Sequence, residues 1–263
     1  MSTSVHRTDA GAPPDAPSLG PGLHAAAPRA WRHAPSCARF LGVAACGLAL
    51  DLWSKHWAFH TLRQGGRWVI VPHALEFQTM LNPGALFGIG GGQTTLFLLA
   101  SAFALLLVGW MFVQSSPRRR LLHVALGSVL AGALGNMYDR AYVRLLEQPV
   151  RSARGAVWVQ SAGQDEKGYV FEEYPPSEKG LRLVRKEPGR EVGFVRDFIK
   201  IPTKIFGERD LWPWVFNVAD MLLVGGVSIL ALFLWFDRRG GHAPIAVGTQ
   251  PAGEAPGSSE RAS

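Results

Sequence analysis

Apolar residues gather in four stretches of this chain, and the segments between them carry nearly all of its charge. A helix needs about 20 predominantly apolar residues to cross the hydrocarbon core of a bilayer. Two of the stretches contain no Asp, Glu, Lys or Arg, and a third contains only Asp220. The pattern therefore predicts an α-helical integral membrane protein with four transmembrane helices. These helices are expected at residues 40–59, 94–113, 121–138 and 214–236.

The first stretch is the least apolar because it contains Asp51 and Lys55. These residues are four apart with the acid N-terminal, so on a helix they face each other in the favourable order. A charge inside a membrane helix is costly unless it is paired. We expect the two side chains to neutralise each other or to contact the outer loops, and to stabilise the first helix rather than to react.

The two long connections, residues 60–93 and 140–213, favour β-structure. Several short segments in them are rich in β-branched and aromatic residues and are bounded by Pro or Gly. We therefore expect β-rich loops outside the helices. The candidate strands lie at residues 67–71, 75–81, 156–160, 168–171 and 194–201.

Both ends of the chain are rich in Ala, Pro, Gly and Ser and lack apolar periodicity. Segments of this composition bury too little apolar surface to offset the entropy of ordering, so both ends are predicted to be disordered. The chain thus divides into a tail (1–36), three helices with the first outer loop (37–140), an outer insert (141–194), the end of the outer loop with the fourth helix (195–239), and a second tail (240–263).

The net charge of +7 would raise the question of nucleic-acid binding in a soluble protein. Here the basic residues cluster at the ends of the apolar stretches, all on one side of a four-helix topology. Cytoplasmic loops carry an excess of Lys and Arg, so both termini are predicted to be cytoplasmic and the two long connections to face outside. We expect no nucleic-acid partner. The clusters are Arg29, Arg32 and Arg39, residues 118–120, and Arg238 and Arg239.

Two acids lie near the ends of apolar stretches, each with an asparagine three residues earlier: Asn136 before Asp139, and Asn217 before Asp220. An intramembrane acid is a functional candidate by default, and this spacing puts each Asn on the helix face of its Asp. Asp139 lies 18 residues from the inner end of its helix, about 27 Å, and Asp220 lies 16 residues from its own, about 24 Å. Both acids are therefore predicted at one level near the outer face.

Two carboxylates at one depth on neighbouring helices cannot both ionise cheaply, so such a pair holds a single proton. That arrangement suits aspartic-protease chemistry, in which the ionised acid takes a proton from water and the protonated acid polarises the scissile carbonyl. This chemistry needs no metal, cofactor or covalent intermediate. The sequence also lacks the Cys spacing that is typical of metal sites.

Three other interpretations stay open on spacing alone. The acids could be interfacial charges at helix ends, they could be oxygen ligands for a cation in a carrier, or the protein could be a membrane scaffold without enzymatic activity. Four short helices without a second helical set count against a carrier, because transporters usually have larger, repeated bundles.

Five motifs around these residues resemble, in order, the motifs of the bacterial lipoprotein signal peptidase (signal peptidase II) family. The resemblance covers residues 40–140 and 194–236. Residues 51–55 resemble D-x-x-[ST]-K, residues 82–87 N-x-G-A-x-F, residues 132–140 G-x-x-G-N-x-x-D-R, residues 195–199 V-x-D-F, and residues 212–220 W-P-x-F-N-x-A-D.

The resemblance implies an aspartic endopeptidase of the bacterial cytoplasmic (inner) membrane that removes signal peptides from diacylglyceryl-modified prolipoproteins. It implies Asp139 and Asp220 as the catalytic dyad, near the outer face, with no cofactor. We expect a monomer whose partners are these prolipoproteins and membrane lipid. The positions that match family residues lining or supporting the site are Asp51, Lys55, Asn82, Asn136, Arg140, Asp197 and Asn217.

One feature departs from the family pattern. The family passes from D-R to V-x-D-F in about ten residues, whereas residues 141–194 separate the two motifs here. A longer loop costs little entropy, so the insertion does not argue against activity. Its mixed charge and many turn residues predict a solvated surface module, and the resemblance assigns it no catalytic residue. Such an insert could act as a lid, a partner-binding module or neutral decoration.

Overall fold

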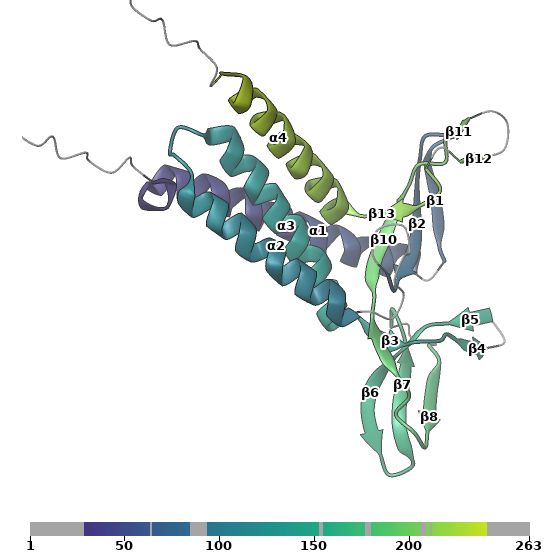
Figure 1. Cartoon of the computed structure of the whole chain (residues 1–263). Helices are drawn as coiled ribbons and strands as arrows, with labels where there is room; N and C mark the ends of the chain where they lie inside the picture. Colours follow the sequence, from purple (N-terminus) through teal and green to yellow (C-terminus); the bar gives the residue numbers. More distant parts are fainter. Residues whose placement is uncertain are drawn as a thin grey trace, which may run out of the picture.

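The computed structural model describes residues 29–63, 65–84, 94–152, 155–176, 180–205, 209–210 and 212–240. Its helices gather at one end of the molecule and its strands at the other (Figure 1). Most of the expected tails, residues 1–28 and 241–263, and the end of the second motif, residues 85–87, lie outside this described part.

Four long helices form the bundle: α1 (Ala34–Leu62), α2 (Thr94–Gln114), α3 (Arg120–Tyr142) and α4 (Val218–Gly240). A 3₁₀ turn, η1 (Ala30–Arg32), precedes α1. The first helix therefore begins inside the range 1–36 that composition predicts to be a tail. Pro35 stands in its first turn, where the missing N–H does no harm.

Helix α3 is the centre of the bundle, because it packs against α1, α2 and α4. Its buried residues include several Gly and Ala, which let neighbouring helices approach closely. At the end of the bundle near η1, one apolar core joins α1, α2 and α3. It consists of Ala30, Phe40, Val108, Phe112, Leu122, Leu126 and Val129.

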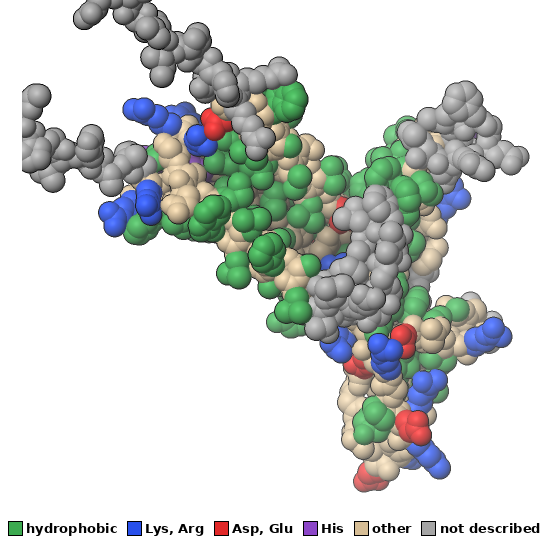
Figure 2. Space-filling view, in the orientation of Figure 1, with side chains coloured by type: hydrophobic (Ala, Val, Ile, Leu, Met, Phe, Trp, Pro, Cys, Tyr) green, Lys and Arg blue, Asp and Glu red, His purple; other side chains and the backbone are tan. Residues whose placement is uncertain are grey.

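Three described segments are long and apolar enough to cross a membrane: Ala34–Leu62, Arg120–Tyr142 and Val218–Asp237. The remaining helix, α2, contributes a shorter apolar segment, Leu98–Gln114. Large apolar side chains on the bundle, such as Phe103, point outward and are exposed. Figure 2 shows hydrophobic side chains covering the flank of the bundle, with charged side chains at its ends. This surface is the one expected of helices that face lipid.

A four-stranded antiparallel sheet caps the end of the bundle that lies away from η1 (Figure 1). It joins β1 (Arg67–Val71) and β2 (Leu75–Asn82), from the first connection, to β10 (Val195–Lys200) and β13 (Val215–Phe216), in the order β1-β2-β10-β13. The expected strands at 67–71, 75–81 and 194–201 are confirmed. The register places Asp197 opposite Met80 and Val195 opposite Asn82. Pairing across the two connections therefore brings two of the motifs together.

The insert folds into short antiparallel sheets. They pair β3 (Arg144–Leu146) with β9 (Glu191–Gly193), β4 (Val150–Ser152) with β5 (Gly155–Val157), and β6 (Val159–Asp165) with β7 (Gly168–Glu173) and β8 (Arg182–Arg185). A further short pair, β11 (Lys204–Ile205) and β12 (Arg209–Asp210), follows β10.

The insert has an apolar core of its own, made of Leu146, Val157, Val159 and Phe171. A second cluster joins it to the start of β10 through Phe194 and Trp158, whose rings lie edge to face with centroids 4.7 Å apart. The insert is therefore more than the solvated surface module that its composition predicts. Its charged residues lie on the outside of the packed strands, and in the composition of the insert they outweigh the few apolar residues that form this core.

Candidate active site

The second Asn-x-x-Asp element builds the N-terminus of α4. Asn217 directly precedes the first helical residue, and its side-chain oxygen accepts a hydrogen bond from the backbone N–H of Asp220 at 3.0 Å. The Asp220 carboxylate in turn accepts from the backbone N–H of Asn217 at 3.2 Å. This reciprocal pair is a capping box. Asn217 thus caps the helix, rather than sharing a helical face with Asp220 as its spacing predicts, and Asp220 is fixed at the positive end of the helix dipole.

Asn136 on α3 connects three parts of the site. Its side-chain amide donates a hydrogen bond to Asp220 Oδ1 at 2.8 Å. Its side-chain oxygen accepts from Lys55 Nζ at 3.1 Å and from Asn217 Nδ2 at 3.2 Å. Asn136 is buried, so these bonds fix its orientation. The expected closeness of the two Asn-x-x-Asp elements is therefore realised through Asn136 and Asp220.

Asp197 on β10 is buried next to the same network. Its carboxylate accepts from Asn82 Nδ2 at 3.0 Å and from Asn217 Nδ2 at 2.7 Å. Burial and, to a smaller extent, the nearby charge of Asp220 raise the pKa of Asp197 to about 8, although the two amide donors act in the opposite direction. At neutral pH Asp197 is therefore mainly protonated.

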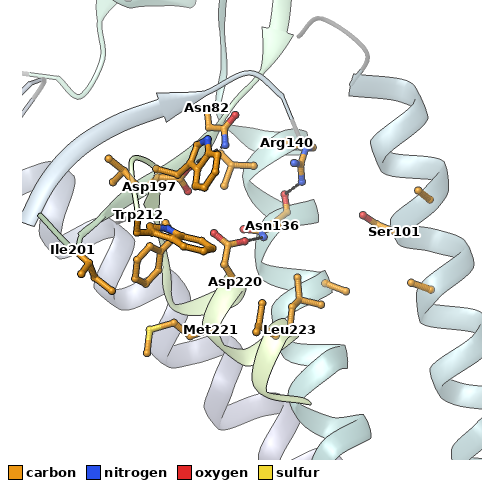
Figure 3. A pocket seen from close by; sticks show the side chains of 18 residues that line it. Asn82, Ser101, Asn136, Arg140, Asp197, Ile201, Trp212, Asp220, Met221 and Leu223 are labelled. Carbon is orange, nitrogen blue, oxygen red and sulfur yellow. Dashed lines mark hydrogen bonds between the residues drawn. The ribbon is translucent and has the colours of Figure 1, made fainter. Parts of the chain in front are cut away.

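A cavity of about 630 Å³ opens between α2, α3, α4 and the sheet. Asp197 and Asp220 both line it, and Figure 3 shows Asp220 beside Asn136, with Asp197 and Trp212 close by. The wall towards the bundle is formed by small and apolar side chains. The full lining consists of Asn82, Ala100, Ser101, Ala104, Ala133, Asn136, Arg140, Val195, Asp197, Ile201, Trp212, Trp214, Val215, Phe216, Asp220, Met221, Leu223 and Val224.

Asp139 lies on α3 but does not line this cavity. Its side chain is fully buried, and its Oδ1 accepts from the Arg196 guanidinium at 2.6 and 3.1 Å. Its Oδ2 accepts from the backbone N–H of Arg196 at 2.9 Å and lies 3.3 Å from Lys55 Nζ. The sequence-based pairing of Asp139 with Asp220 stays a prediction. The geometry favours Asp197 as the acid that shares the cavity with Asp220.

The expected ion pair on the first helix is confirmed. Lys55 Nζ lies 2.8 Å from Asp51 Oδ2, and both side chains are fully buried. The other oxygen of Asp51 accepts from the backbone N–H of Ala219 in the first turn of α4, at 2.8 Å. Asp51 therefore contributes to the N-terminus of α4, while Lys55 connects Asp51 to Asp139 and Asn136.

Gly135 makes room for this buried pair. A Cβ at this position would collide with the Asp51 carboxylate and lie 3.3 Å from the Ala219 side chain. We predict that Gly135→Ala lowers the free energy of unfolding by about 1–3 kcal/mol, the range for forcing an extra carbon into a packed site. Thermal unfolding in detergent measures the effect. Gly42→Ala is the matched control on α1, because its Cβ would meet nothing within 4 Å. A stability loss as large in Gly42→Ala would show that any added methyl disturbs the bundle.

Arg140 links the connection between α1 and α2 to α3. Its side chain donates to the backbone carbonyl of Asn136 at 3.3 Å and to the backbone carbonyl of Gly84 at 3.0 Å. It is buried and lines the cavity beside Asp197. The seven expected supporting positions thus meet in one network, either lining the cavity or holding a group that does.

Sequence reasoning missed two features of this network. Arg196 occupies the variable position of the V-x-D-F motif, so the motif carries no signal for its contact with Asp139. Asp197 is among the expected supporting positions, but its place in the cavity beside Asp220 has no signal in helix depths, because Asp197 lies on a strand. No group of three or more His, Cys, Asp or Glu side chains is arranged to hold a metal among the residues that the structure describes.

Comparison with known proteins relates this arrangement to one family. Residues 43–236 match the family profile described as signal peptidase (SPase) II. The lipoprotein signal peptidase of Rhodopirellula baltica is 31% identical over 225 residues, which cover 83% of this chain and 81% of the relative. That of Leifsonia xyli is 28% identical over 233 residues, covering 87% and 81%. A solved structure of a bacterial membrane enzyme superposes with a TM-score of 0.54 at 22% identity, covering 80% of this chain and 93% of that one. This last similarity concerns the fold alone.

Proposed function

This chain belongs to the signal peptidase II family, a family of membrane proteases, and from that premise we propose that it cleaves diacylglyceryl-modified prolipoproteins as an aspartic endopeptidase. The observation that carries the mechanism is the pair of carboxylates, Asp197 and Asp220, on one cavity. One of them is protonated near neutral pH because of burial and its neighbour's charge. This is the state that an acid–base pair of carboxyl groups requires.

The proposed steps use only these two groups and water. Ionised Asp220 takes a proton from a water molecule as the water oxygen attacks the scissile carbonyl carbon, and Asp197 donates a hydrogen bond and then its proton to the carbonyl oxygen. The resulting gem-diol is neutral. The proton held by Asp220 passes to the amide nitrogen, the C–N bond breaks, and one hydroxyl proton returns to Asp197. Both acids regain their starting states.

We assign Asp197 to this pair, in place of the sequence-predicted Asp139, for a physical reason. The Asp139 carboxylate is fully buried, accepts three hydrogen bonds from Arg196 and lies 3.3 Å from Lys55 Nζ, so all of its roughly four acceptor sites are engaged. A group held this way has neither access to water nor a free lone pair to offer a substrate. We assign Asp139 the role of holding β10, which carries Asp197.

The surroundings of the pair suit an acylated peptide in a membrane. The cavity wall is mainly apolar, with Trp212 and Trp214 at its outer end and Ala100 and Ala104 of α2 across from α4. Aromatic side chains of this kind favour the membrane–water interface. We propose that all four helices span the inner membrane of a bacterium, with both termini in the cytoplasm and the cavity near the outer face. We further propose that the enzyme acts as a monomer in contact with lipid.

The rival function is cation-coupled transport, since the same carboxylates and amides supply oxygen ligands. The two functions differ in a direct assay. Purified protein in liposomes should cleave a lipobox peptide that carries a diacylglyceryl group, and EDTA should leave the rate unchanged. A failure to cleave accompanied by ion flux would favour the carrier, whereas cleavage that stops with EDTA would contradict a mechanism that uses only two carboxyl groups and water.

The pH dependence follows from Asp197. Its pKa of about 8 lies far above that of an ordinary carboxyl group, so the group is protonated below pH 8 and loses its proton as the pH rises through that value. The protonated form is the active one, so kcat/KM should decline above about pH 8 in proportion to the protonated fraction. A rate profile on a short lipopeptide measures this decline.

The variant Asn82→Ala provides the control for the assignment. The Asn82 amide donates to the Asp197 carboxylate and so lowers its pKa. Without this bond the decline should move to higher pH. If the pH of the decline in kcat/KM is unchanged or lower in this variant, the decline reports the titration of a group other than Asp197.

A further inference from the structure

One side chain of the insert, that of Tyr174, packs at the end of α1 next to the sheet that carries Asp197. Tyr174 follows β7, and its backbone N–H donates to the carbonyl of Trp158 at 2.9 Å, so it belongs to the insert. Its ring packs towards Phe59 at the end of α1, with centroids 6.4 Å apart. Tyr174 packs against both the cluster around Phe194 and the cluster around Phe198, as does Leu81 of β2.

The Tyr174 hydroxyl forms a side-chain hydrogen bond with Arg196. Arginine only donates, so the tyrosine oxygen accepts. Burial raises the pKa of Tyr174, which keeps the hydroxyl protonated at any physiological pH. The neutral Tyr174 hydroxyl therefore accepts a hydrogen bond from the Arg196 guanidinium over the whole physiological pH range.

The other contacts of Arg196 lead to the proposed catalytic acid. The guanidinium and the backbone N–H of Arg196 both donate to Asp139, at 2.6 and 2.9 Å. Asp139 is thereby attached to β10 at the position that directly precedes Asp197. A shift of the guanidinium would disturb both bonds, and through them the backbone that orients Asp197.

We propose that Tyr174 of the insert is a positioning residue for cleavage, because it holds Arg196 in the orientation that fixes Asp139 and the strand bearing Asp197. The inference rests on the proposed function. It gives the insert a role beyond lid, partner-binding module or decoration, since the insert completes the support of the catalytic strand. Arg196 and Tyr174 act together, and neither touches the substrate.

The test compares Tyr174→Phe with a matched control, Tyr169→Phe, in full-length protein in liposomes. Tyr169 lies on β7 of the same insert and packs in the insert's own core. On a short diacylglyceryl lipopeptide, Tyr174→Phe should lower kcat about tenfold with little change in KM, because small misplacement of a catalytic group costs rate rather than binding. Tyr169→Phe should match the unmodified protein.

A double-mutant cycle separates positioning from general destabilisation. If Tyr174 acts through Arg196, Tyr174→Phe should have no further effect on kcat in an Arg196→Gln background. Arg196→Lys should reproduce the loss, since a lysine cannot offer a fork to Asp139 and Tyr174 together. This variant carries the test alone if Tyr174→Phe does not fold.

Three results would overturn the inference: equal kcat in both tyrosine variants, an undiminished effect of Tyr174→Phe in Arg196→Gln, or a rise in KM at constant kcat. The last result would mean that the insert guides substrates instead. Failure of the unmodified protein to cleave the lipopeptide would contradict the proposed function itself, and this outcome is distinct from all three.

Discussion

Asp197→Asn and Asp220→Asn should each abolish prolipoprotein cleavage while the protein stays folded in the membrane. Each substitution removes one partner of the proposed acid–base pair and keeps the size of the side chain, although Asn can accept with only one of the two oxygens that the carboxylate uses. Loss of a proton-transfer group lowers kcat by about 10²–10⁴-fold, and we expect the upper part of this range because each acid acts in both halves of the reaction. Turnover of a diacylglyceryl lipobox peptide by purified variants measures the loss.

Asp139→Asn distinguishes the two possible pairs. An Asn at position 139 has a single acceptor oxygen, so it keeps either the bond from the backbone N–H of Arg196 or those from its guanidinium, but not both. We therefore expect reduced stability, with activity well above that of Asp197→Asn. The matched control is Asp237→Asn, on the same helix as Asp220 but in an exposed ion pair with Arg119, and it should leave activity unchanged. Full activity in Asp197→Asn together with none in Asp139→Asn would restore the sequence-predicted dyad.

The hydrophobic pattern predicts the helices well because their length and apolarity are local properties. The boundaries fell short of the structure at the start of α1, where Ala34 to Cys37 are helical although their composition resembles the tail. The pair of Asp51 and Lys55 was predictable as well, since a spacing of four residues fixes their distance on any helix. Such features need no knowledge of the tertiary fold.

The composition of the cavity could not be predicted in the same way. Asp197 meets Asn82 across 115 positions of sequence, through the pairing of β10 with β2. Strand pairing at this separation has no local signal, because register depends on the whole sheet. Depth along a helix is defined for Asp139 and Asp220 but not for an acid on a strand, so it does not predict that Asp197 lies in the cavity with Asp220.

The two Asn-x-x-Asp elements show how identical spacing can serve two structures. Around Asp220 the spacing forms a capping box, with Asn217 just outside the helix. Around Asp139 both residues are inside α3, and they point to different partners: Asn136 to Asp220, and Asp139 to Arg196. The pattern identifies two helices that line the cavity, but the same spacing occurs at a helix cap and in a helix interior, so it does not distinguish the two.

Lys55→Ala should be the most destabilising single change in the bundle. Lys55 is fully buried between two carboxylates, 2.8 Å from Asp51 and 3.3 Å from Asp139. Removing the cation leaves buried negative charge without its partner, which typically costs about 3–5 kcal/mol. Thermal unfolding in detergent, measured as the loss of protease resistance with rising temperature, should show a large fall in Tm. Arg119→Ala is the control, because its ion pair with Asp237 is exposed and such pairs contribute about 0–1 kcal/mol.

The double variant Asp51→Ala/Lys55→Ala should be more stable than Lys55→Ala alone. It removes one of the two charges that Lys55 neutralises, and Asp139 keeps its bonds to Arg196. Some loss should remain, because the backbone N–H of Ala219 loses its acceptor at the start of α4. We therefore expect the double variant to lie between the unmodified protein and Lys55→Ala. If it is instead the least stable of the three, the capping of α4 by Asp51 outweighs its pairing with Lys55, and Asp51 serves the active site directly by holding the helix that presents Asp220.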